Sequence, residues 1–128
     1  MKIEHIAIWV KNLELIRDFY CKYFNMVSNN LYHNKSKNFK SYFLSFPESE
    51  TRIEIMQCPE VPDSAITEFS RGLTHLAFSV GNQAEVERLT ENLREDGYRI
   101  AGGPRITGDG YYESVILDPE GNRIEITG

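Results

Sequence analysis

Long apolar runs, cysteine and basic charge are all scarce in this sequence. No segment approaches the roughly 18 consecutive apolar residues that a membrane-spanning helix needs, and the first residues lack the pattern of a secretory signal. The two cysteines, Cys21 and Cys58, form no paired motif, which is typical of free thiols in a reducing compartment. We therefore expect a cytoplasmic protein that does not contact membranes.

Acidic residues outnumber basic ones. The 14 lysines and arginines are set against 19 aspartates and glutamates, so the formal net charge is −5 at pH 7. A nucleic-acid interface needs a concentrated basic face, so the composition argues against nucleic acid as a partner. The length of 128 residues, with 41% hydrophobic and 26% charged residues, is ordinary for one globular domain.

The two halves of the sequence repeat one another. The segment around His5 resembles the segment around His75: His, Ala, Val and Asn match, and the positions between them stay apolar. The tetrapeptide Arg-Ile-Glu-Ile occurs at 52–55 and again at 123–126. Because the matches fall in the same order at nearly the same offset, we predict a duplicated structural unit.

The repeat sets the predicted domain organisation. We expect one domain over 1–128, made of a first module at about 1–57, a linker at about 58–72 and a second module at about 73–128. Each module should contain a strand, a helix and three further strands, which gives an α+β fold of two βαβββ modules.

Hydrophobic periodicity and turn residues place the elements. Asn12 and Asn82 are predicted to cap the two helices, and Gly97 should end the second helix in a left-handed conformation. The first half is predicted to hold strands at 2–10, 27–33, 39–46 and 51–57 and a helix at 13–24. The second half is predicted to hold strands at 73–80, 98–101, 111–117 and 123–127 and a helix at 83–96.

Strand alternation brings one histidine and one glutamate to the same face in each half. Side chains alternate across a strand, so the isoleucines beside Glu54 and Glu125 should face the helices while the two carboxylates face away. His5 and His75 should point to those same non-helix faces. A lone histidine or glutamate on a strand is more often structural or solvent-facing, but matched pairs on matched strands favour a metal site.

Two imidazoles and two carboxylates form a borderline ligand set. Such a set suits Zn, Ni, Co, Mn or Fe(II), and four protein ligands in a six-coordinate site leave two positions open. An open position is what a Lewis-acid catalyst requires. We therefore predict one divalent metal per site, held by His5, Glu54, His75 and Glu125.

Three stretches of the chain resemble the vicinal oxygen chelate superfamily, and within it the glyoxalase I-like group. They are residues 5–10 with Asp18-Phe19-Tyr20, residues 72–78, and the segment Asp118-Pro119-Glu120-Gly121-Asn122-Arg123-Ile124-Glu125. The resemblance implies strands that curl into a cupped mixed sheet around the metal. It also implies a homodimer whose site lies between two chains, or a swapped arrangement that closes the site within one chain.

The order of the four ligands is similar to that of bacterial glyoxalase I, a lactoylglutathione lyase that isomerises a hemithioacetal. That resemblance implies Ni or Zn, with Co, Mn or Fe as alternatives. Such enzymes usually carry an arginine and an asparagine where this chain has Trp9 and Cys58. Glutathione would lose a charge-assisted partner worth about 1.5–3 kcal/mol, which argues against it as the thiol.

The resemblance suggests a mechanism as a hypothesis. The metal polarises two adjacent substrate oxygens and stabilises an enediolate, while a glutamate moves a proton between neighbouring carbons. Glu125 is the first candidate for this base and Glu54 the second. Trp9, Arg105 and Tyr111 are candidates for contacting the small-molecule substrate, although each also suits a packing or surface role.

Other functions fit the same residues. An isomerase similar to methylmalonyl-CoA epimerase would differ mainly in where the proton is returned. Another metalloenzyme, such as a dioxygenase or a thiol transferase, is a further alternative, and a dioxygenase would need redox-active Fe or Mn. A binding protein that sequesters a small molecule without turnover is the third, and the complete four-ligand set counts against it.

Overall fold

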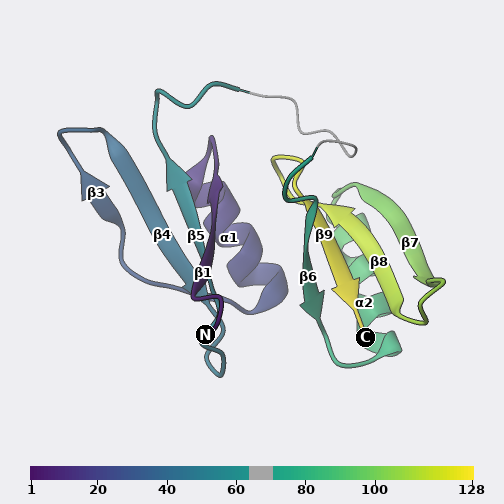
Figure 1. Cartoon of the computed structure of the whole chain (residues 1–128). Helices are drawn as coiled ribbons and strands as arrows, with labels where there is room; N and C mark the ends of the chain where they lie inside the picture. Colours follow the sequence, from purple (N-terminus) through teal and green to yellow (C-terminus); the bar gives the residue numbers. More distant parts are fainter. Residues whose placement is uncertain (64–70) are drawn as a thin grey trace. The chain divides into compact units, whose positions relative to one another are not determined.

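Two units of the chain, residues 1–64 and 65–128, each have their own helix and sheet. The structure is a computed structural model that describes residues 1–63 and 71–128. In both units a strand is followed by a helix and then by antiparallel strands, as Figure 1 shows. This order confirms the predicted α+β fold of two βαβββ modules. Part of the predicted linker, residues 64–70, lies outside the described residues.

In unit 1 the first and last strands pair in parallel. The sheet order is β1-β5-β4-β2, with β3 also pairing with β4, and every pair except β1 with β5 is antiparallel. The elements are β1 (His5–Trp9), α1 (Leu13–Phe24), β2 (Val27–Ser28), β3 (Tyr32–Asn34), β4 (Phe39–Ser45) and β5 (Arg52–Gln57).

The strand predicted at 27–33 is wrong as one element, because β2 and β3 are separate. Asn29 breaks it: its side-chain Oδ1 accepts the backbone N–H of Phe43 at 2.8 Å, and its own N–H donates to the Phe43 carbonyl at 3.1 Å. A side chain that takes the place of a backbone acceptor interrupts the regular ladder between two strands.

Unit 2 repeats this plan with the sheet order β6-β9-β8-β7, in which β6 and β9 are parallel. The predicted strand at 98–101 is too short, since β7 runs through Gly102, Gly103 and Pro104. Proline is accepted there because β7 is an edge strand, and its pairing with β8 has register shifts. The elements are β6 (His75–Ser79), α2 (Gln83–Glu95), β7 (Ile100–Ile106), β8 (Tyr112–Leu117) and β9 (Arg123–Thr127).

Both helices begin as the sequence predicts; α1 also ends at the predicted residue, and α2 ends one residue before its predicted end. Asn12 Oδ1 accepts the N–H of Leu15 at 3.0 Å, and Asn82 Oδ1 accepts the N–H of Glu85 at 3.0 Å. Gly97 has φ +88°, the left-handed conformation that glycine adopts readily after a helix. The two units thus share their helix starts as well as their strand order.

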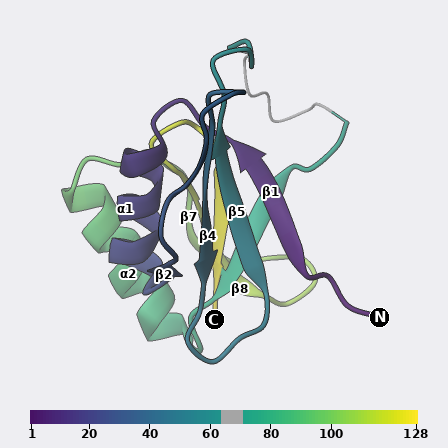
Figure 2. The same ribbon diagram turned by 90° about the vertical axis from the view of Figure 1, so that its left-hand side faces the viewer.

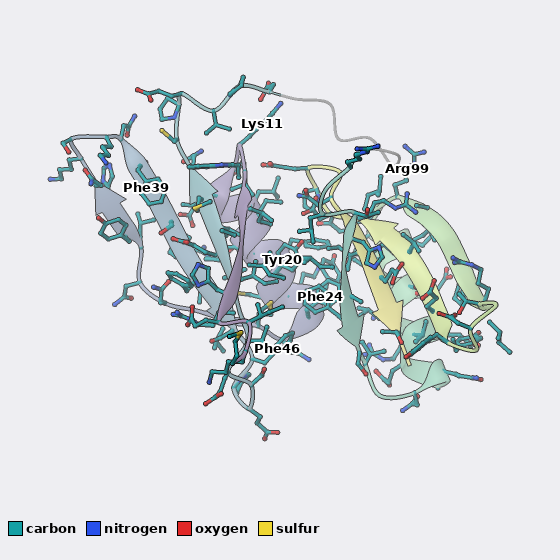
Figure 3. The ribbon with its side chains drawn as sticks, in the orientation of Figure 1. Lys11, Tyr20, Phe24, Phe39, Phe46 and Arg99 are labelled. Carbon is teal, nitrogen blue, oxygen red and sulfur yellow. The ribbon has the colours of Figure 1, made fainter. Side chains whose placement is uncertain are left out.

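Each helix covers one face of its own sheet. Figure 2 shows α1 on one side of β4 and β5, and Figure 3 labels Tyr20 and Phe24 on this helix. In unit 1 the fully buried side chains include Ile16, Tyr20, Leu44 and Ile55. In unit 2 they include Val86, Leu93, Ile116, Ile124 and Ile126. The opposite face of each sheet is therefore available for polar groups.

Among the described residues, no helix is long and apolar enough to cross a membrane.

Candidate functional site

The same strand register places a histidine and a glutamate near one another in each unit. In unit 1, His5 lies opposite Arg52 and Ala7 lies opposite Glu54. In unit 2, His75 lies opposite Arg123 and Ala77 lies opposite Glu125. Because residues two apart share a face, each histidine is a diagonal neighbour of its glutamate. The predicted alternation of the strands is confirmed in both units.

The two pairs differ in their spacing. His5 Nε2 lies 3.9 Å from Glu54 Oε2, whereas His75 Nε2 lies 3.2 Å from Glu125 Oε2. The carboxylates are largely covered, with 16% of the Glu54 side chain and 21% of the Glu125 side chain exposed. A covered carboxylate is costly unless it has a hydrogen-bond partner, a charged partner or a bound ion, so both glutamates are suited to binding a cation.

The donor atoms of the pair in unit 2 have a spacing that suits one divalent cation. Two ligands that each lie about 2.0–2.2 Å from an ion are about 3.0–3.5 Å apart. The separation of 3.2 Å in unit 2 lies within that range, and the separation of 3.9 Å in unit 1 lies beyond it. Imidazole nitrogen and carboxylate oxygen together suit Zn, Ni, Co, Mn and Fe. Within residues 1–63 and 71–128, no group of three or more His, Cys, Asp or Glu side chains has metal-site spacing. Within each unit, the structure brings one predicted histidine ligand beside one predicted glutamate ligand.

The imidazole of His5 is held from two sides. Its Nδ1 hydrogen-bonds the Glu4 carboxylate, and the other oxygen of Glu4 accepts from Arg52. The ring also packs edge-to-face on Phe43 with 5.3 Å between centroids, and the Arg52 guanidinium lies over that same ring at 4.1 Å. The hydrogen bond from His5 and the charge of Arg52 hold the pKa of Glu4 below its usual value.

The surroundings of His75 are different. By register, Thr74 corresponds to Glu4, and Val115 lies opposite Glu125 as Phe43 lies opposite Glu54. Neither Thr74 nor Val115 can supply an anionic acceptor or an aromatic wall. Within the described part of the chain, Glu125 is the one group that forms a hydrogen bond, ion pair or ring contact with the His75 imidazole, through Nε2.

An aromatic surface extends from the His5–Glu54 pair along the open face of unit 1, which is the face of its sheet that α1 does not cover. Trp9 follows His5 by four residues on β1 and packs edge-to-face on Phe39, with 6.1 Å between ring centroids. Phe39, labelled in Figure 3, also contacts Tyr32 at 6.1 Å. Trp9 is 48% exposed and Tyr32 is 53% exposed. This face can therefore contact a planar or apolar part of a ligand.

The open face of unit 2, which α2 does not cover, carries a charged pair in place of these aromatic rings. Arg105 Nη2 donates to Glu113 Oε1 at 3.3 Å, and Arg105 Nη1 would lie 2.8 Å from a Cβ at Gly102. Gly102 therefore leaves the space that this guanidinium occupies. Tyr111 is 59% exposed in a turn that its carbonyl closes by accepting the N–H of Thr107 at 2.8 Å. The contacts of Tyr111 do not reach His75 or Glu125 within the described residues.

Both cysteines are free, as the sequence predicts, and each is half-buried. The Cys58 thiol donates to the backbone carbonyl of Lys37 at 3.9 Å. Burial raises the pKa of the Cys21 thiol.

Sequence reasoning missed the groups that surround His5. Glu4, Arg52 and Phe43 were not among the predicted site residues. The repeat itself carried the signal, since Glu4 and Thr74 differ at matched positions beside matched histidines. Glu113 was also missed, although alternation along β8 places it on the same face as the residue opposite Glu125.

Comparison with known proteins agrees with this architecture of duplicated βαβββ units. The chain matches the model of the Glyoxalase/Bleomycin resistance protein/Dioxygenase superfamily over residues 2–126. The uncharacterized protein YqjT of Bacillus subtilis (strain 168) is 28% identical over 130 residues, which cover 97% of this chain and 96% of YqjT. The chain therefore belongs to this superfamily, also known as the vicinal oxygen chelate superfamily.

Solved structures with the name glyoxalase share the fold. A glyoxalase family protein from Enterococcus faecalis has a TM-score of 0.79 and 25% identity, over 99% of this chain and 97% of that one. Glyoxalase I from Zea mays has a TM-score of 0.81 and 22% identity, over 98% of this chain. The match covers 44% of the maize chain, so this chain spans less than half of that enzyme.

Proposed function

We propose that the chain is a divalent-metal enzyme of the glyoxalase I-like type, a lyase or isomerase for a small α-hydroxy carbonyl compound or a hemithioacetal. The observation that carries this proposal is the pairing of histidine Nε2 with a glutamate carboxylate twice, at the same register of two parallel strand pairs. A purely structural role for the histidine does not explain why the same histidine–carboxylate pair recurs in both units.

The proposed metal ligands are His5, Glu54, His75 and Glu125, with Ni or Zn as the expected metal. When bound, the ion would supply Lewis-acid polarisation of adjacent substrate oxygens. The covered carboxylates and their Nε2 partners support this assignment, because each pair already presents two ligand atoms on one sheet face. Co, Mn and Fe fit the same donor set.

Glu125 is the proposed catalytic base. Its carboxylate would remove the proton beside the substrate carbonyl and return it to the neighbouring carbon, a role that general acid–base catalysis gives to a positioned carboxylate. Glu125 Oε2 lies 3.2 Å from His75 Nε2, on the face of the sheet that α2 does not cover, and this position supports the assignment. Glu54 is the second candidate.

Trp9, Arg105 and Tyr111 are the proposed substrate contacts. The exposure of Trp9 beside His5 supports an apolar contact, and the half-exposed guanidinium of Arg105 supports contact with an anionic group. Tyr111 has the exposure but no contact with the His75 pair, so it is the weakest of the three. Since Trp9 and Cys58 replace the arginine and asparagine that the resemblance implies, we expect a thiol other than glutathione.

The two modules are proposed to act together as one domain, in a homodimer. The four ligands can come from the two units of one chain or from units of two chains, and mixed variants distinguish these cases. A His5→Ala chain mixed with a His75→Ala chain regains activity only when a site is shared between chains. Random exchange would then leave about a quarter of the sites intact. No recovery after verified subunit exchange would place the site within one chain.

Turnover tests the function. Protein freed of metal, then supplied with Ni²⁺ or Zn²⁺, should isomerise hemithioacetals made from methylglyoxal and a panel of thiols. Activity should require the metal and disappear with a chelator. The same protein should be assayed for epimerisation of an α-substituted thioester and for ring cleavage of a catechol with Fe²⁺. Epimerisation or ring cleavage without any isomerisation of hemithioacetals would contradict the proposed reaction.

A further inference from the structure

The two histidines occupy copied positions, but within residues 1–63 and 71–128 a hydrogen bond at Nδ1 is found for His5 and not for His75. His5 Nδ1 hydrogen-bonds the Glu4 carboxylate. Since an ionised carboxylate is only an acceptor, this bond puts the imidazole proton on Nδ1. The unprotonated lone pair of His5 then lies on Nε2, the atom that faces Glu54.

Glu4 is itself held in place. Arg52 donates to its second carboxylate oxygen, and the Arg52 backbone N–H donates to the Glu4 carbonyl at 3.3 Å. The guanidinium of Arg52 is braced in turn by the face of Phe43, at 4.1 Å. Arg52 on β5, braced by Phe43 on β4, therefore holds the carboxylate that orients His5.

His75 lacks two of these supports, although Arg123 lies at the position that corresponds to Arg52. Thr74 stands where Glu4 would be, and Val115 stands opposite Glu125 where an aromatic ring would be. The remaining contact of His75 among the described residues is from Nε2 to Glu125 at 3.2 Å. In the metal-free protein we expect the proton of neutral His75 on Nε2, the nitrogen that faces the carboxylate.

We infer that Glu4, oriented by Arg52, is a positioning residue that holds His5 with Nε2 ready to bind a metal, so that unit 1 is the fixed half of the site and unit 2 the adjustable half. The consequence for metal binding rests on the proposed function. The consequence for the two imidazole tautomers does not, because it concerns the protein without metal.

The asymmetry suits the proposed chemistry. A carboxylate that serves as a base must be able to leave its ligand position, and its neighbouring histidine must be able to adjust. Glu125 has the adjustable histidine beside it, whereas Glu54 has the fixed one. Orienting partners of metal-bound histidines typically account for 10- to 100-fold in metal affinity, so Glu4 should matter and Thr74 should not.

The direct test is the tautomeric state of each histidine. Metal-free protein labelled with ¹⁵N-histidine is measured by long-range ¹H–¹⁵N correlation at about pH 8.5, above the ordinary imidazole pKa of ~6.5. The chain has three histidines, so single substitutions assign each ring. We expect the proton on Nδ1 of His5 and on Nε2 of His75. Glu4→Ala should move the His5 proton toward Nε2, while the matched Thr74→Ala should leave His75 unchanged.

Metal titration is the second readout. Glu4→Ala should weaken Zn²⁺ binding by about 10- to 100-fold, Glu4→Gln should weaken it less because an acceptor oxygen remains, and Thr74→Ala should change it by less than about twofold. Glu4 is exposed, and thermal unfolding of each variant checks that folding is intact. The inference is overturned if both histidines share one tautomer, or if Glu4→Ala and Thr74→Ala behave alike. A wild-type protein that binds no metal would contradict the proposed function. The tautomer result would not be affected, because it concerns the metal-free protein.

Discussion

The open face of unit 1 surrounds its histidine with aromatic rings, whereas the corresponding face of unit 2 carries an arginine and a second glutamate. Trp9 and Phe43 lie on the face of His5, and Arg105 and Glu113 lie on the face of His75. The backbone register around the two histidine–glutamate pairs is the same in both units.

The comparison shows what a duplicated fold keeps and what it varies. The parallel strand pair fixes the diagonal position of histidine and glutamate, so both units retain that geometry. The residues that surround the pair are on neighbouring strands and can change without moving it. The proposed function therefore assigns the fixed metal ligand and an apolar substrate contact to unit 1, and proton transfer beside a charged group to unit 2.

The largest expected effect is a difference in kcat between variants of the two glutamates. At saturating metal, Glu125→Gln should lower kcat by about 10²- to 10⁴-fold, because the amide cannot accept the substrate proton. Glu54→Gln should mainly weaken metal binding and lower kcat by less. Steady-state kinetics at increasing Ni²⁺ or Zn²⁺ measures both effects. Undiminished turnover in Glu125→Gln, or the reverse order of the two variants, would remove the functional distinction between the units.

A buried hydroxyl pair distinguishes the helix-facing side of unit 2. Thr90 Oγ1 and Ser114 Oγ are 2.6 Å apart, and both residues are almost fully buried. Thr90→Val leaves the Ser114 hydroxyl without its partner and should lower the free energy of unfolding by about 1–3 kcal/mol. Denaturant unfolding measures the change.

Two control variants sharpen this result. Thr90→Ser keeps the hydroxyl and should lose only the packing of one methyl group. The double variant Thr90→Val with Ser114→Ala removes both hydroxyls and should recover part of the loss, since no buried group is left unpaired. Equal losses in Thr90→Val and Thr90→Ser would show that the hydroxyl pair contributes little.

The aromatic face of unit 1 should contribute to substrate affinity. Trp9→Ala should raise KM by about 2- to 10-fold, as expected for losing one aromatic contact worth about 0.5–1.5 kcal/mol. Trp9 is the sole tryptophan of the chain, so quenching of its fluorescence by substrate reports the same contact. Leu15→Ala, which removes an exposed side chain on α1, is the matched control. A KM that does not change in Trp9→Ala would contradict this assignment.

The smallest expected effect is a decrease in the free energy of unfolding at alkaline pH. Burial, followed by the hydrogen bond to Glu14 at 2.8 Å, raises the pKa of Tyr42 above its ordinary value of ~10. The unfolded chain therefore loses this proton first as the pH rises. The stability due to neutral Tyr42 is complete below about pH 10 and is lost as the pH rises through the folded-state pKa. Unfolding measured from pH 8 to about pH 11 should show this decline in the wild type and a smaller one in Tyr42→Phe.

The sequence predicted the parts of the fold that depend on local patterns. Asn12 and Asn82 cap their helices, Gly97 adopts its left-handed turn, and alternation puts each histidine on the face of its glutamate. These features follow from a residue and its near neighbours along the chain. The strands with irregular pairing depend on partners far away in the sequence, and they were predicted less well.

Contacts between strands could not be predicted. The position of Arg52 over the Phe43 ring depends on the antiparallel register of β4 and β5, and the interrupted strand at 27–33 depends on Asn29 replacing a ladder bond to Phe43. Both involve residues far apart in sequence. The residues that make the units unequal were therefore the ones that the sequence pattern left out.

Metal content of the purified protein tests the central claim most directly. Elemental analysis after exchange into buffer with Zn²⁺ and removal of free metal should find about one ion per proposed site in the wild type and in the control His33→Ala. His5→Ala and His75→Ala should each lose most of that ion, since each removes one ligand. A wild-type protein without bound metal, or histidine variants that retain it fully, would contradict the proposal that both pairs bind the cation.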